Sequence, residues 1–151
     1  MNKMSPTTDK LYEHDFVAWC EDTVAKLKSR ELDSLDFDNL IEEIASLGRS
    51  ERRELKNRLT VLLSHILKRR YVNSPENFRG WELTIIEQRR QIKNLLQDSP
   101  SLKPYLGQIF AGAYDDALEE VRFEYQRTEF PNTWQFDIEA DALLAKTYWE
   151  E

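Results

Sequence analysis

The chain has 151 residues, of which 40% are hydrophobic and 32% are charged, and its formal net charge is −7. A chain of this length can bury about 68–70% of the surface that its unfolded form exposes, so it can fold without disulfides or a metal. Its low content of Gly and Pro and its single cysteine exclude collagen-like, disulfide-framework and disordered proteins. No stretch is apolar over a bilayer's thickness, and the first ten residues lack the apolar core of a signal peptide, so we expect a cytoplasmic protein.

Hydrophobic residues recur at helical spacing almost throughout, and no segment alternates as a half-buried strand would. The sequence therefore predicts an all-α protein, a compact antiparallel bundle of about five helices plus a short C-terminal helix. We expect one domain over residues 1–151, with residues 1–8 flexible. The first helix is predicted from about residue 9 to residue 29, and a second helix is predicted from Asp36 to its end at Gly48.

A third, separate helix is predicted from about Ser50, because apolar residues recur at helical spacing from Leu55 to Ile66. Residues 73–75 interrupt the pattern, and a fourth helix follows and stops at residues 98–100. A fifth helix is predicted from Pro104 to about residue 126. The tail over residues 130–151 is too aromatic for a free end, so we expect it to pack on the bundle or on a partner, with a short helix over 137–145.

Charge is divided unevenly along the chain. Residues 1–48 carry 5 basic and 11 acidic groups (net −6), residues 49–114 carry 13 and 6 (net +7), and residues 115–151 carry 3 and 11 (net −8). The basic third helix is typical of a phosphate-binding surface, and it is also typical of a helix that pairs with acidic helices of its own fold. We favour the second interpretation because the whole chain is acidic, which makes nucleic-acid binding unlikely.

Several polar residues lie on or beside the predicted apolar stripes. Asp15, Glu43, His65 and Arg89 are the main ones, and Arg69 flanks the same stripe as His65. The structural interpretation is that Glu43 or Asp15 holds a buried Arg89, because a buried guanidinium needs a carboxylate partner. The functional interpretation is a polar pocket that binds an anion through the arginines or uses His65 as a proton carrier.

Trp81 follows a glycine near a helix start, where it forms either the edge of that pocket or part of the core. Glu43, His65 and Glu87 would make only a sparse and irregular set of metal ligands, so we expect no metal. The four glycines are isolated, and no nucleophile elbow or cysteine motif is present. We therefore predict no catalytic residues and no cofactor.

Three stretches resemble a known family: LYEHDFVAW from Leu11, DNLIEEIASLGRSERRE from Asp38, and TIIEQRRQIKNLLQDSPSL from Thr84. They are similar to the bacterial family catalogued as domain of unknown function number twenty-nine. The resemblance implies an all-helical, soluble bacterial protein, and it implies no activity. Seven residues match the pattern of that family: Asp15, Glu43, Arg49, His65, Trp81, Glu87 and Arg89.

The favoured function is a non-catalytic module that binds another protein or forms a homo-oligomer through an exposed helix face or the aromatic tail. The alternative is a small enzyme or an anion- or ligand-binding protein with a pocket around Glu43, His65, Trp81 and Arg89. Nucleic-acid binding through the basic third helix ranks last, and no membrane partner is expected.

Overall fold

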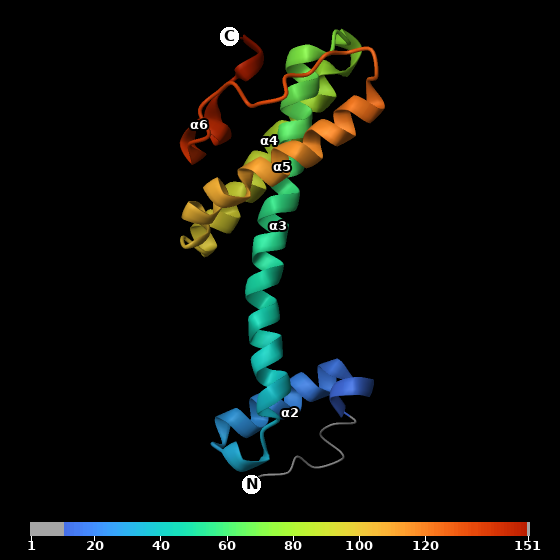
Figure 1. The fold of residues 1–151 in the computed structure, drawn as a ribbon. Helices are drawn as coiled ribbons and strands as arrows, with labels where there is room; N and C mark the ends of the chain where they lie inside the picture. The colour runs from blue at the N-terminus through green and yellow to red at the C-terminus, as the bar shows by residue number, and fades with distance from the viewer. Residues whose placement is uncertain (1–10, 151) are drawn as a thin grey trace. The chain divides into compact units, whose positions relative to one another are not determined.

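A computed structural model describes residues 11–150, and every regular element within them is a helix (Figure 1). The described part contains no strand, which confirms the predicted all-α class. The segment 1–8, expected to be flexible, lies outside the described residues. Where we expected one domain, the chain divides into two compact units, Met1–Arg49 (unit 1) and Ser50–Glu151 (unit 2).

Unit 1 contains the helix α2 (Phe16–Lys28), the short 3-10 helix η1 (Leu32–Ser34) and the first part of α3 (Phe37–Tyr71). α2 begins after Asp15, whose carboxylate accepts a hydrogen bond from the backbone N–H of Ala18 at 3.0 Å. Residues 11–14 are helical as well, so the helix predicted over residues 9–29 is interrupted at Asp15. The reason is that a short acidic side chain competes with the helix interior by capping a new helix start.

α3 is one helix of 35 residues, whereas the sequence predicted two helices separated at Gly48. That prediction was wrong because Gly48 does not take the positive φ of a helix-ending glycine. A glycine inside a helix costs only about 1 kcal/mol relative to alanine, which is too little to end a long helix. Ile44 and Leu55 are 11 residues apart, close to three helical turns, so they lie on the same face of the helix, with Gly48 and Glu51 between them.

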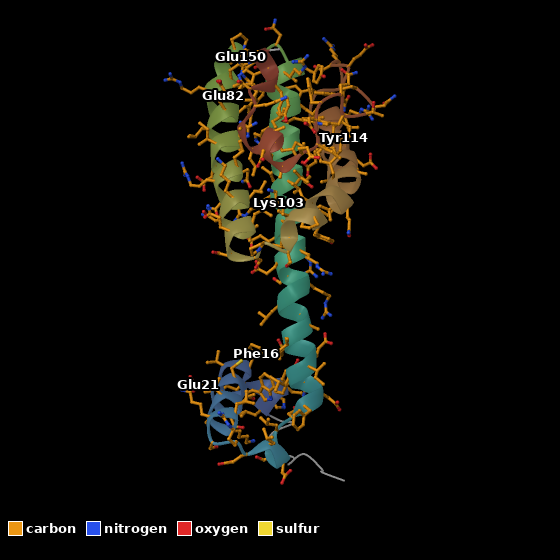
Figure 2. The ribbon with its side chains drawn as sticks, turned by 90° about the vertical axis from the view of Figure 1, so that its left-hand side faces the viewer. Phe16, Glu21, Glu82, Lys103, Tyr114 and Glu150 are labelled. Carbon is orange, nitrogen blue, oxygen red and sulfur yellow. The ribbon has the colours of Figure 1, made fainter. Side chains whose placement is uncertain are left out.

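Unit 2 contains the second part of α3, α4 (Pro75–Asp98), α5 (Leu102–Glu124), α6 (Ala140–Ala145) and the 3-10 helix η2 (Tyr148–Glu150). Within this unit, α4 and α5 lie on either side of α3, and α6 lies between them (Figure 2). The breaks predicted at residues 73–75 and 98–100 coincide with the connections on either side of α4. None of the helices within residues 11–150 combines the length and the apolar character needed to cross a bilayer.

The core of unit 2 is made by α3, α4, α5 and the C-terminal segment. Trp134 contacts the rings of Phe110 and Tyr114 edge-on, with 5.8 Å between ring centroids in each pair. The Tyr114 hydroxyl donates to the Pro131 carbonyl at 2.7 Å. The aromatic tail therefore packs on unit 2 itself. The largest side chains that are almost completely buried are Leu55, Leu59, Leu62, Leu63, Ile66, Leu67, Ile85, Ile92, Val121, Leu143 and Tyr148.

Candidate functional site

The five residues predicted to form a site are divided between the two units, because Asp15 and Glu43 belong to unit 1 and the other three to unit 2. Asp15 is the N-cap of α2. The Glu43 carboxylate accepts a hydrogen bond from the Tyr12 hydroxyl, and this bond is the main reason why the pKa of Tyr12 is raised to about 12. Both acids thus hold local structure in unit 1.

Arg89 reaches from α4 to the C-terminal end of α6. Its Nε donates to the Leu143 carbonyl at 2.9 Å, and its Nη2 donates to the Lys146 carbonyl. We expected Glu43 or Asp15 as its partner, and the structure provides backbone carbonyls instead. A guanidinium suits this place because the last carbonyls of a helix lack intrahelical donors and carry partial negative charge. Burial lowers the pKa of Arg89 from its usual value.

The arginines at the end of α3 are also engaged within unit 2. The Arg69 guanidinium lies over the Phe78 ring, 3.8 Å from its centroid, and its Nε is 3.7 Å from a Glu82 carboxylate oxygen. Arg70 donates to the Tyr148 carbonyl. Together with Arg89, these side chains attach the C-terminal segment to α3 and α4, so each guanidinium has partners within unit 2.

His65 and Trp81 contribute to the packing of unit 2. The Nδ1 atom of His65 is 2.8 Å from the Val61 carbonyl, which can only accept, so Nδ1 carries the proton of the neutral ring. Burial is the main reason why the pKa of His65 is lowered. Trp81 is 8% exposed, contacts Tyr125 edge-on at 6.0 Å and has the Lys68 ammonium 5.6 Å from its ring centroid. Of the two interpretations of Trp81, the structure shows the core.

A groove of about 630 Å³ lies between α3 and α5 of unit 2. This groove was not predicted from the sequence. The available signal was the spacing of Asp116, Glu119 and Glu120, which are three and four residues apart and so share one face of α5. Within the described residues, no three His, Cys, Asp or Glu side chains are grouped as metal ligands would be. The residues that line the groove are Asn57, Thr60, Val61, Asp116, Glu119, Glu120 and Phe123.

Unit 1 carries most of the exposed apolar surface that the structure describes. Among residues 11–49, only Trp19 and Leu35 are buried hydrophobic residues, and Trp19 packs against Tyr12 and Phe16. Nine of the thirteen large hydrophobic side chains exposed within residues 11–150 lie in unit 1, and we call them the unit 1 apolar surface. They are Phe16, Val17, Val24, Leu27, Leu32, Phe37, Ile41, Ile44 and Leu47.

A family model described as "Domain of unknown function DUF29" matches residues 11–149, so the chain belongs to this family. The match covers most of unit 1 and nearly all of unit 2. No curated protein and no solved structure matches the chain.

Proposed function

We propose that this protein is a non-catalytic self-association module, in which the unit 1 apolar surface binds a second copy of the chain. The observation that carries the proposal is the exposure of one α3 stripe, where Ile41, Ile44 and Leu47 are 64%, 61% and 68% exposed. The three side chains follow one another at three-residue spacing and so are neighbours on the helix surface, and exposed apolar surface of this kind marks interaction sites.

Unit 1 buries too little to be stable on its own. Its described residues, 11–49, bury two large hydrophobic side chains, Trp19 and Leu35. A unit of 49 residues buries a small fraction of its surface on folding, so its stability is marginal. The unit has a single cysteine, Cys20, which is free, so no disulfide within the unit stabilises it, and a partner surface would add stability.

The apolar stripe of α3 supports the same conclusion. Leu55 is fully buried in unit 2, and Ile44 lies on the same face of the helix three turns earlier. Covering a large aliphatic side chain is worth about 1.5–3 kcal/mol, so leaving this part of the stripe in water forgoes a large stabilisation. A second copy is the partner that every preparation of the protein contains, and two-fold dimers are the commonest assemblies of identical chains.

The two competing functions have weaker support. Glu43 lies in unit 1, and His65, Trp81 and Arg89 each have partners inside unit 2, which weakens the alternative of one ligand pocket around these four residues. Several cations of α3 are paired with acids of the same unit, including Lys56 with Asp116 at 3.4 Å and Lys68 with Glu124 at 3.7 Å. Such pairs reduce the charge available for nucleic-acid phosphates.

The proposal is tested by the molar mass of the purified chain, measured by light scattering over a range of concentrations. We expect twice the 18.0 kDa of one chain at high concentration and a single chain on dilution. The double variant Ile44→Glu/Leu47→Glu should remain a single chain throughout, with unchanged helical circular dichroism, because carboxylates in the interface would have to lose their hydration.

The matched control is Phe123→Glu, which introduces the same charge at a side chain that is 81% exposed in unit 2. This variant should associate like the wild type. A wild-type chain that stays at 18.0 kDa at every concentration would overturn the proposal, and so would a control that dissociates as fully as the double variant.

A further inference from the structure

We infer that unit 1 docks on the outer face of α4 in the second copy. In the dimer, unit 1 of each copy, which is apolar and acidic, binds the α4 face of the other copy, which is apolar and basic. The inference rests on the self-association proposed above and names the surface that completes it. We define the α4 outer face by five exposed residues: Arg79, Leu83, Ile86, Arg90 and Lys93.

The α4 outer face combines apolar and cationic side chains along one line of the helix. Leu83 is 66% exposed and Ile86 is 53% exposed, and the two lie three residues apart. Arg79 is four residues before Leu83, and Arg90 is four residues after Ile86. Residues three and four apart are neighbours on a helix surface, so the apolar pair has a cation at each end. The other two large exposed hydrophobics described in unit 2, Phe123 and Ile138, are not on α4.

A hollow of about 320 Å³ adjoins this face and is lined by Ile86, Arg89, Arg90, Lys93 and Leu144. Arg89 is held there by the carbonyls at the end of α6, and Arg90 contacts Glu87 at 2.7 Å. Lys93 is exposed at the rim. An apolar wall with cations around it is suited to an acidic side chain that stands beside apolar ones.

Unit 1 presents the complementary pattern on α2. Val17 is 66% exposed and Val24 is 48% exposed, and Glu21 stands between them at helical spacing. Figure 2 shows Glu21 on the side of α2 away from α3. On α2 of unit 1, an exposed acid lies between two exposed valines. On α4 of unit 2, two exposed apolar side chains lie between two exposed arginines. The described part of unit 1, residues 11–49, carries 4 basic and 10 acidic groups, a net charge of −6.

Charge decides between this arrangement and a contact of unit 1 with its own copy. Two unit 1 surfaces would bring net charges of −6 and −6 together, whereas the α4 outer face exposes three cations, Arg79, Arg90 and Lys93, of which Arg90 contacts Glu87. Opposite charges across an interface speed encounter and suppress the like-charged alternative. Exchanging two identical contacts between two copies also satisfies the two-fold symmetry of a closed dimer.

The test mixes two full-length variants that are each defective in a different surface. One carries Val17→Lys/Glu21→Lys on the α2 face of unit 1 that complements α4, and the other carries Leu83→Glu/Ile86→Glu on α4. Each variant alone should lose at least tenfold in association affinity, with helical circular dichroism retained. Mixed in equal amounts, they should form a heterodimer, because the first still has an intact α4 face and the second an intact unit 1. Phe123→Glu is again the control that associates like the wild type.

Salt gives a second and independent measurement. Raising the ionic strength from 0.05 M to 0.5 M should weaken wild-type association if unit 1 meets the basic α4 face, since screening removes an attraction. Pairing of two acidic unit 1 surfaces would instead strengthen with salt.

The outcomes separate the two proposals. A wild-type chain that never associates overturns self-association. A Leu83→Glu/Ile86→Glu variant that associates like the wild type leaves self-association standing and overturns the α4 docking face. Two variants that are each monomeric and remain monomeric when mixed overturn the reciprocal exchange. Association that strengthens with salt also contradicts the α4 face.

Discussion

The two units of this protein use the same long helix differently. In unit 2, the α3 side chains Leu55, Leu59 and Leu62 are at most 1% exposed, whereas in unit 1 the same helix leaves Ile41 and Leu47 64% and 68% exposed. Both segments have the spacing of an amphipathic helix. An amphipathic stripe therefore shows that a helix needs a partner, and it does not show whether the same chain supplies one.

The contrast is tested most strongly by making the same substitution in both parts of α3. Leu62→Ala should lower the free energy of unfolding by about 2–5 kcal/mol, because it leaves a cavity in a closed core. Leu47→Ala should change it by no more than about 0.5 kcal/mol in protein dilute enough to be monomeric, because the side chain is 68% exposed. Urea unfolding followed by circular dichroism measures both. Equal losses would show that the unit 1 stripe is covered within a single chain.

Arg89 provides a second test of the difference between the two units, because this polar side chain of unit 2 is hydrogen-bonded to backbone carbonyls of the same unit. Arg89→Met should cost about 1–3 kcal/mol, since it leaves the carbonyls of Leu143 and Lys146 without their donor. Hydrogen exchange should increase over residues 140–148. The control, in protein dilute enough to be monomeric, is Arg90→Met on the next residue, which removes an exposed contact with Glu87 and should change stability by less than about 1 kcal/mol. Equal effects of the two substitutions would mean that the α6 contacts of Arg89 stabilise nothing.

The smallest expected effect is a pH dependence in unit 2. Burial lowers the pKa of His65 below its ordinary value of 6.5, so folding favours the neutral ring. The contribution of His65 is present above pH 6.5 and is lost as the pH falls through the lowered value. The wild type should therefore lose stability relative to His65→Gln below pH 6.5, by less than about 1 kcal/mol because the ring is partly exposed. Thermal unfolding at pH 7.5, 6.5 and 5.5 checks this, and parallel pH profiles would show that His65 is not the group responsible.

Much of the fold could be predicted, because helix ends in this chain follow local chemistry. The sequence itself contains the signals for Pro75 at the first turn of α4 and for the end of this helix at residues 98–100. Gly48 misled because its identity alone does not reveal its φ angle. The interruption at Asp15 has the same origin, since an acidic residue fits both the outer face of a helix and the cap of the next one.

The candidate site was harder to predict than the fold. Helical spacing placed Glu43 and Arg89 on apolar faces but could not assign them to different units. The partners of Arg89 are backbone carbonyls, which every residue carries, so no side-chain pattern marks them. Similarly, spacing identified the apolar stripe at Ile44 without showing that its own chain leaves it exposed.

The burial of Tyr148 has a consequence for how the protein is made. This side chain is 0% exposed in the core of unit 2, and its backbone carbonyl is held by Arg70 from α3. The core of unit 2 therefore cannot form completely on the ribosome until residue 148 has been translated. The unit 1 apolar surface has been synthesised well before that point. During that interval the nascent chain shows hydrophobic surface at both of its parts, which is the state that chaperones recognise.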